Sequence, residues 1–312
     1  MRMGNCPFSV TAVEAVDTIE QVADVHVGYR RAHAKGVAYD AMFQPSDAIA
    51  KYTTAPHFQT QPVQAIVRFS HSSPSPHSPE LLNPIKGMAV RFMLENGGFT
   101  NLTMANIPVF VTKTPEAFVQ LLQVFAKDTL SFKEKLNALR DSPEFHTIPK
   151  LLSSLKPVRS FALESYHSLH AYYLVNTHDE KVAVRFKWEP VQSETAQLSN
   201  STDLETELEQ RMEKEQVKFR LMVQFAEGTD LINDPSTPWP EDRKNVAGGV
   251  LTLSRRREDG AEDYQFDPTV LPKGVECTDD PVLHFRSQAY EESANRRQRE
   301  RDLDKMNGNL EM

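Results

Sequence analysis

The sequence predicts an α+β fold in which helices surround a mostly antiparallel sheet or barrel. The first observation behind this prediction is that short strand-like runs recur along the 312 residues, with few long helical stretches between them. Because parallel strands need long crossover connections, an antiparallel arrangement is favoured over a doubly wound sheet. The second observation is that no Gly/Ser-rich linker and no repeating period divides the chain, so we expect one domain over residues 1–312.

The predicted strands follow from the alternation of side chains. In QAIVRFS (64–70), Ile66, Arg68 and Ser70 fall on one face, because successive side chains of a strand point to opposite sides. In KVAVRFKW (181–188) four apolar side chains share a face, namely Val182, Val184, Phe186 and Trp188. Further strands are predicted at 87–94, 103–112, 169–176, 217–225 and 248–255.

The predicted helices are recognised by their first residues. Thr114 followed by Pro115 is a cap-and-proline signal, and apolar residues at helical spacing continue it to Phe125. A second helix is predicted at 131–141, and the acidic run 194–216 is interpreted as a solvated loop and helix without chemistry. A long final helix begins at Asp280 and Pro281, again an N-cap followed by proline.

Composition excludes several classes of protein. The net charge of −8 and pI near 5.7 argue against general binding to nucleic acid or to anionic membranes. No apolar run approaches the roughly 20 residues of a membrane-spanning helix, and residues 1–12 lack a secretory pattern, so a cytoplasmic location is expected. The two cysteines, Cys6 and Cys277, are interpreted as reduced thiols, because they form neither a disulfide framework nor a metal-binding motif.

One stripe of the final helix permits two interpretations. Arg286, Tyr290 and Arg297 stand at positions i, i+4 and i+11, which places them within about 40° of arc on a helix. The stripe is either a solvated cationic face carrying a tyrosine, or a site where a tyrosinate binds a ferric ion. A tyrosine ionises with a pKa near about 10, and a guanidinium one turn away favours the phenolate. Tyrosinate is also an axial ligand of haem iron in some enzymes.

Several short motifs decide between these interpretations. They occur in the following order: RRAHAKG at 30–36, VRFS at 67–70, KGMAVRF at 86–92, PVF at 108–110, FDP at 266–268, PKGVE at 272–276, RSQAY at 286–290, and then Arg297. Each motif is short, but their joint order and spacing are specific. The sequence resembles the haem-dependent catalase superfamily, and in particular its short branch of catalase-related peroxidases.

This resemblance implies a catalase-like antiparallel β-barrel core with surrounding helices, and ferric haem b as cofactor. It implies that His33 is the acid and base above the haem, with Ser70 holding its imidazole by a hydrogen bond. Tyr290 would be the axial ligand of the iron, and Arg286 would support its phenolate form.

The resemblance also implies contacts with the rest of the haem. Arg30, Arg68 and Arg297 would bind the two propionates, since guanidinium groups form strong charge-assisted hydrogen bonds with carboxylates. These arginines would also help to keep His33 neutral and able to act as a base. Phe118 is the candidate for stacking on the porphyrin.

One position departs from the family's pattern. Counted back from Pro108, the asparagine that the family places beside the peroxide falls on Ala105, whereas Asn106 is the asparagine in this chain. A shift by one residue along a strand reverses the face of a side chain. Either a local bulge presents Asn106 to the peroxide, or the site lacks this amide.

The resemblance implies a haem-dependent peroxidase that cleaves hydrogen or organic peroxides through a ferryl intermediate and oxidises small organic donors, with weak catalase activity. Compared with full-length catalases, the chain has a short N-terminal arm and no C-terminal helical domain, which implies a more open site. A fatty-acid hydroperoxide isomerase or dehydratase of the allene oxide synthase type, and a non-catalytic haem-binding protein, remain alternatives. The sequence leaves assembly into a homo-oligomer open.

Overall fold

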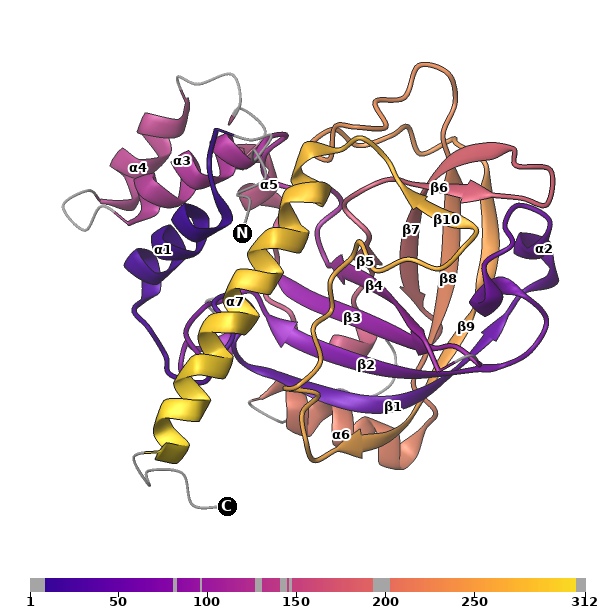
Figure 1. Ribbon diagram of the computed structural model, residues 1–312, viewed down its shortest axis with the longest axis horizontal. Helices are drawn as coiled ribbons and strands as arrows, with labels where there is room; N and C mark the ends of the chain where they lie inside the picture. Colours follow the sequence, from indigo (N-terminus) through magenta and orange to yellow (C-terminus); the bar gives the residue numbers. More distant parts are fainter. Residues whose placement is uncertain are drawn as a thin grey trace.

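Eight antiparallel strands close into a barrel in the computed structural model, which describes residues 9–80, 83–95, 97–126, 131–140, 145, 148–192 and 203–306 (Figure 1). Cys6 and the first part of the acidic run, 194–202, lie outside these residues. The strands of the ring are β1 (Gly36–Pro45), β2 (Val63–His71), β3 (Lys86–Met93), β4 (Phe99–Ala105), β5 (Tyr166–His167), β7 (Lys181–Pro190), β8 (Lys218–Phe225) and β9 (Asn245–Arg257).

The ring closes where β7 pairs with β8, and two short strands, β6 (Tyr172–Val175) and β10 (Val275–Cys277), extend from β7 outside it. The predicted antiparallel barrel is therefore confirmed.

The interior of the barrel holds the main apolar core. Val67 and Phe69 of β2 point inward, whereas Ile66 on the same strand packs outside with Ala38 and Phe266. Val184, Phe186 and Trp188 of β7 also point inward, which confirms the face predicted for this strand. The outer face of β2 therefore carries Ile66, Arg68 and Ser70, and this is the face on which the site is built.

The helices gather mainly at one side of the barrel (Figure 1). They are α1 (Ala12–Ala23), α2 (Asp47–Ala50), α3 (Pro115–Phe125), α4 (Phe132–Arg140), α5 (Ile148–Ser154), α6 (Leu204–Lys214) and α7 (Pro281–Met306), with 3₁₀ turns at Pro56–Phe58 and Phe161–Leu163. Helix α7 runs across the outside of the barrel, and α1, α3 and α4 lie on its other side. The helices predicted to begin at Thr114 and Asp280 are confirmed.

Two predicted strands need new bounds, and two elements were not predicted. The strand predicted at 103–112 is β4, which begins at Phe99 and ends at Ala105. Pro108 follows soon after, and proline has no N–H to donate to a strand ladder. The strand predicted at 169–176 is confined to β6, and both β1 and α1 were missed by the sequence reasoning.

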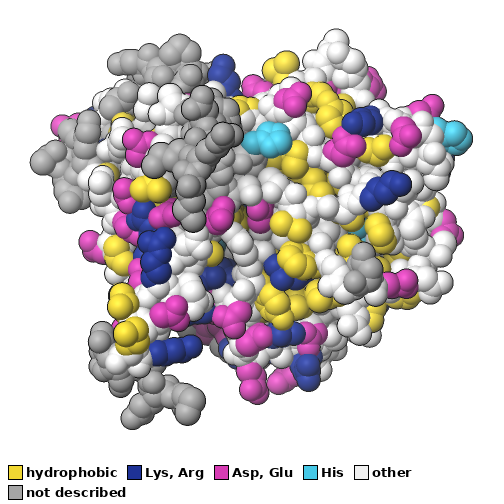
Figure 2. Space-filling view, viewed as in Figure 1, with side chains coloured by type: hydrophobic (Ala, Val, Ile, Leu, Met, Phe, Trp, Pro, Cys, Tyr) yellow, Lys and Arg dark blue, Asp and Glu magenta, His cyan; other side chains and the backbone are white. Residues whose placement is uncertain are grey.

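The visible surface mixes charges of both signs. In Figure 2 the lysine and arginine side chains are interspersed with aspartate and glutamate, most densely below the middle of this face. Among the described helices, none combines the length and the apolar character needed to cross a lipid bilayer.

Candidate active site

His33 lies in the segment that leads into β1, on the outer face of the barrel. Its Nδ1 is 2.9 Å from Oγ of Ser70 on β2, as the sequence predicted. Its backbone has a φ of 56°, which is uncommon for a residue other than glycine. Nη1 of Arg68 donates a hydrogen bond to the carbonyl oxygen of His33 at 3.1 Å, and this contact helps to hold the conformation.

Gly87 on β3 provides the space for this imidazole. It pairs with Ser70 across the β2–β3 ladder. A Cβ atom at this position would lie 2.9 Å from Nδ1 and Cε1 of His33 and from Oγ of Ser70. Only glycine therefore leaves room for the ring, which gives a physical reason for the glycine in the KGMAVRF motif.

The surroundings of His33 favour a neutral imidazole. Burial among protein atoms, followed by the positive charges of Arg68, Arg286 and Arg30, lowers the pKa of His33 to about 3. The imidazole is therefore unprotonated across the neutral range and has a lone pair available to accept a proton.

Helix α7 supplies the second half of the site. Nη2 of Arg286 donates a hydrogen bond to the hydroxyl oxygen of Tyr290 at 2.9 Å, one helical turn away, as predicted. Oγ of Ser287 donates to Oδ2 of Asp267 at 2.6 Å, which ties this turn of the helix to the FDP motif. Arg286 is also among the charges that lower the pKa of His33, so the two halves of the site lie within electrostatic reach of each other.

A buried contact between a histidine and an aspartate, in the electrostatic neighbourhood of Arg286, was missed by the sequence reasoning. Nδ1 of His170 is 2.6 Å from Oδ2 of Asp280, and both side chains are fully buried. Oδ1 of Asp280 accepts hydrogen bonds from the backbone of Val282 and Leu283, so the same carboxylate begins α7. The N-cap was visible in the sequence, but the partner His170 stands 110 residues away and no local pattern joins them.

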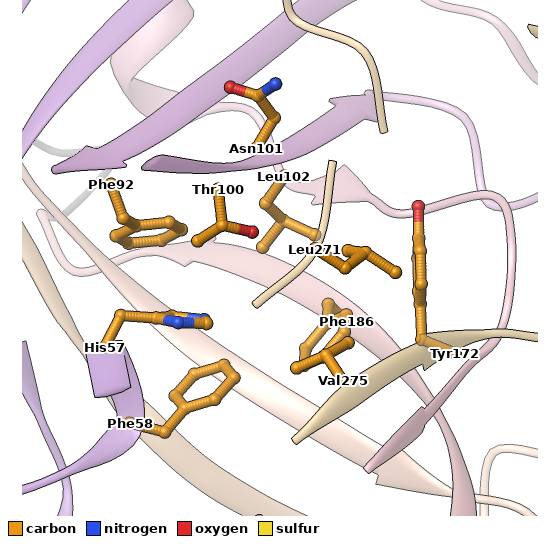
Figure 3. Close-up of a pocket in the computed structure, with 10 residues that line it drawn as sticks. All are labelled: His57, Phe58, Phe92, Thr100, Asn101, Leu102, Tyr172, Phe186, Leu271 and Val275. Atoms are coloured by element: carbon orange, nitrogen blue, oxygen red, sulfur yellow. The ribbon is translucent and has the colours of Figure 1, made fainter. Parts of the chain in front are cut away.

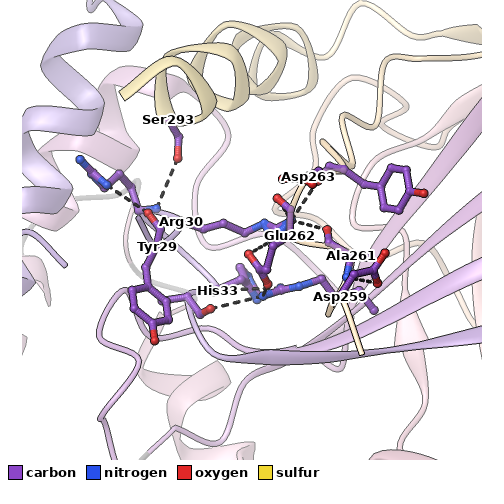
Figure 4. Close-up of polar contacts among 12 residues, drawn as sticks. Tyr29, Arg30, His33, Asp259, Ala261, Glu262, Asp263 and Ser293 are labelled. Carbon is purple, nitrogen blue, oxygen red and sulfur yellow. Dashed lines mark hydrogen bonds and ion pairs between the residues drawn. The ribbon is translucent and has the colours of Figure 1, made fainter. Parts of the chain in front are cut away.

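Arg30 and Arg68 meet around one carboxylate, that of Glu262. Figure 4 shows Arg30 beside this carboxylate. Nη1 of Arg30 lies 2.9 Å from Oε2, and Nη2 of Arg68 lies 3.1 Å from Oε1. Nη2 of Arg30 also donates to the carbonyl oxygens of Ala261 and Tyr264, both at 2.9 Å. Burial and the nearby Arg68 lower the pKa of Arg30 to about 9, although Glu262 opposes this shift.

Arg297 extends this group of cations along α7. Its residue is 7% exposed, and its charge is coupled to those of Arg30, Arg68 and Glu262. Its guanidinium group forms no ion pair with the residues that the structure describes. We call Arg30, Arg68 and Arg297 the arginine cluster.

The side chain of Asn106 makes its hydrogen bonds away from His33. Its Oδ1 accepts a hydrogen bond from the backbone N–H of Lys86 at 2.8 Å, and its Nδ2 donates to Pro84 and to Glu164. The β3–β4 pairing runs without a register shift up to Gly87 and Ala105. Without a bulge, Ala105 shares the face of Gly87, so the geometry favours the second alternative, a site without this amide.

Phe118 lies on α3, and its ring is 5.4 Å from that of Phe110, measured between centroids. Phe110 in turn lies 6.1 Å from the ring of His170. The aromatic pair thus neighbours the buried histidine behind Arg286. Stacking of Phe118 on a porphyrin stays a prediction.

A separate pocket lies beside the 3₁₀ turn Pro56–Phe58 (Figure 3). Its lining is mostly apolar and consists of His57, Phe58, Phe92, Thr100, Asn101, Leu102, Tyr172, Phe186, Leu271 and Val275. None of the predicted site residues is among them, so this pocket is not the candidate active site.

Comparison with known proteins decides which family the chain belongs to. A family profile described as Catalase matches residues 2–309. The chain belongs to the catalase family. It is 32% identical over 310 residues to a catalase-related peroxidase of Synechococcus elongatus, covering 95% of this chain and 91% of that protein.

Other members of the catalase family show the same relationship. A catalase-related peroxidase of Mycolicibacterium paratuberculosis is 31% identical over 300 residues, covering 91% of this chain and 94% of that protein. A catalase of Alkalihalophilus pseudofirmus is 26% identical over 306 residues, but the match covers only 43% of that longer protein. The match therefore covers nearly the full length of the two catalase-related peroxidases, but less than half of the longer catalase.

Membership of the catalase family implies a haem cofactor, and the residues of the site fit this group. Nε of Arg68 and Nη1 of Arg286 are buried donors without a hydrogen-bond partner among the described residues. Such donors are costly unless an anion or another acceptor reaches them. Together with the buried guanidinium of Arg297 and the oxygen of Tyr290, they form a donor set suited to a ferric porphyrin with two carboxylates.

Proposed function

We propose that this catalase-family protein is a haem-dependent peroxidase that cleaves hydrogen or organic peroxides and oxidises small organic donors, with weak catalase activity. The observation that carries the proposal is the arrangement of two pairs on one side of the barrel. His33 with Ser70 forms one pair, and Tyr290 with Arg286 forms the other. The names of the two catalase-related peroxidases that match nearly the whole chain support the same activity.

The haem, bound as the ferric form of haem b, would supply an iron centre that accepts a peroxide oxygen and two oxidising equivalents. Tyr290 would bind this iron as phenolate, with Arg286 donating a hydrogen bond to its oxygen. Arg30, Arg68 and Arg297 would hold the propionates, and Phe118 would contact the ring.

The proton transfers belong to His33. Its neutral imidazole would take a proton from one peroxide oxygen and return it to the other oxygen, which leaves as water or alcohol. Ser70 orients the ring through Nδ1, which leaves Nε2 for this transfer.

We attribute weak catalase activity to strand β4, which pairs with the strand β3 that lies beside His33. The position beside Gly87 on β4 is Ala105, whose methyl group cannot donate a hydrogen bond to a second peroxide. The amide of the following residue, Asn106, is hydrogen-bonded to Lys86, Pro84 and Glu164. An organic donor is then the more effective reductant. A cytoplasmic location remains a prediction, and assembly into a homo-oligomer remains open.

The test is haem binding and donor oxidation by the purified protein and one variant. The wild-type protein should bind ferric haem stoichiometrically, show the absorption spectrum of tyrosinate-bound iron, and oxidise a phenolic donor when peroxide is added. Tyr290→Phe should lose this spectrum and at least tenfold in haem affinity. Tyr39→Phe is the matched control, because Tyr39 is buried in the barrel and its hydroxyl has no partner among the described residues. A wild-type spectrum that persists in Tyr290→Phe would refute the ligand assignment.

A further inference from the structure

The arginine cluster contains its own carboxylate, which the sequence motifs did not reveal. Glu262 comes from the loop that follows β9, far in sequence from both Arg30 and Arg68. Its two oxygens are divided between the two guanidinium groups, at 2.9 Å and 3.1 Å. Its side chain is 32% exposed, whereas that of Arg68 is 4% exposed, so the carboxylate lies at the rim and the cations lie deeper.

The loop holds Glu262 in this place. Gly260 and Ala261 both have left-handed backbones, with φ of 57° and 54°. Oδ1 of Asp259 accepts a hydrogen bond from the N–H of Ala261 at 3.0 Å, and Asp259 is itself bound by Arg257. Ala261 is fully buried despite its unfavourable conformation. The backbone carbonyls around it converge on Arg30, as Figure 4 shows, so the loop is a formed part of the cluster.

Counting charges indicates what Glu262 does. Three guanidinium groups and one carboxylate leave the cluster with a net charge of about +2, and the two propionates of haem b carry −2. Without haem, Glu262 is the only carboxylate among the described residues that contacts Arg30 or Arg68. A buried cation that loses its partner destabilises the fold, so Glu262 stabilises the haem-free protein. The same negative charge repels the propionates.

We propose that Glu262 is the built-in counter-ion of the arginine cluster. Its carboxylate stabilises the haem-free protein and, by repelling the propionates, weakens the binding of haem. This inference rests on the haem binding proposed above. Glu262 is a positioning residue, since it holds Arg30 and Arg68 by ion pairs and touches no reacting atom. Its removal should therefore change two properties in opposite directions, whereas loss of a merely structural contact would impair both.

The experiment compares wild-type protein with Glu262→Gln, an isosteric change that removes only the charge. Denaturant unfolding of the haem-free proteins should show a lower midpoint for the variant. Titration with ferric haem b should show roughly tenfold tighter binding, because one like charge close to the propionates is gone. With the dimethyl ester of haem b, which lacks both carboxylates, the two proteins should bind equally.

The matched control is Glu300→Gln, which removes a carboxylate from the buried Arg31, outside the cluster. It should lower the stability of the haem-free protein and leave haem affinity within about twofold. The inference is overturned if Glu262→Gln binds haem b no more tightly than wild type, or if the gain is the same with the diester. Absence of haem binding by the wild-type protein would overturn the proposed function as well, so the two failures are distinguishable.

Discussion

At the scale of single residues, the proposed peroxide cleavage depends on the hydrogen bond between His33 and Ser70. Ser70→Ala should retain haem and slow peroxide cleavage by about tenfold, because the ring loses the partner that orients it at 2.9 Å. His33→Ala should slow the same step by about 10² to 10⁴. Stopped-flow absorbance after mixing with peroxide measures both rates. Ser254→Ala, at an exposed position on β9, is the control and should react as wild type. Equal rates in wild type and His33→Ala would exclude the role of His33.

The neighbouring positions 105 and 106 give a second prediction at this scale. Ala105→Asn places an amide on the face of β4 that Gly87 shares, and should raise oxygen release from hydrogen peroxide by at least tenfold. Asn106→Ala should leave oxygen release unchanged, because that amide is bound to Lys86, Pro84 and Glu164. An oxygen electrode measures both variants. A drop in oxygen release on Asn106→Ala would show that its amide reaches the peroxide after all.

Part of the candidate site could be predicted at the residue scale. Arg286 and Tyr290 stand one helical turn apart, so their contact follows from local spacing, whereas the pairing of His33 with Ser70, 37 residues apart, was expected only from the resemblance to the catalase superfamily. Glu262 and His170 could not be predicted, since each meets its partner only through the folded barrel. For Asn106 the opposite holds. The residue type suggested contact with the peroxide, but the β3–β4 register places Ala105, and not Asn106, on the face shared with Gly87.

At the scale of elements, helix α7 depends on the carboxylate with which it begins. Asp280→Asn can still accept the hydrogen bonds of Val282 and Leu283 but loses the charge that faces His170. We expect it to lower the free energy of unfolding by about 2 kcal/mol. Asp280→Ala loses the cap as well and should cost about 1 kcal/mol more. Chemical denaturation of the two variants measures the difference, and equal losses would show that the cap contributes nothing.

The elements differ in how well the sequence predicted them. Helices α3 and α7 begin with a capping residue and a proline, which is a strong local signal. Helix α1 has a capping box between Thr11 and Glu14, a signal that was present and overlooked. Strand β1 was harder to predict from the sequence. Most of its side chains are buried on both faces, so apolar and polar residues alternate only weakly.

At the scale of the whole molecule, buried neutral histidines make stability depend on pH. Burial lowers the pKa of His57 to about 3, while an exposed histidine has a pKa near about 6.5. Below pH 6.5 the unfolded chain therefore binds a proton that the folded protein refuses, so stability is lost as the pH falls toward 3. His33 and His167 add to this effect with pKa values of about 3 and about 4.

His57→Phe isolates the contribution of one such group. His57 stacks on Phe92 at 4.8 Å, so a phenyl ring suits the position. Between pH 7 and pH 5, His57→Phe should lose on the order of 2 kcal/mol less stability than wild type. Urea denaturation at both pH values gives the difference, and replacement of the exposed His178 by Gln is the control. An unchanged slope in His57→Phe would mean that the buried imidazole takes up a proton without cost.

The two halves of the site lie far apart in the sequence, with His33 before β1 and Tyr290 after β10. A ribosome synthesising this chain completes the entire barrel before the tyrosine leaves the exit tunnel. With Tyr290 as the proposed haem ligand, haem could be bound only after this residue has been synthesised, and a chain truncated before Tyr290 should not bind haem.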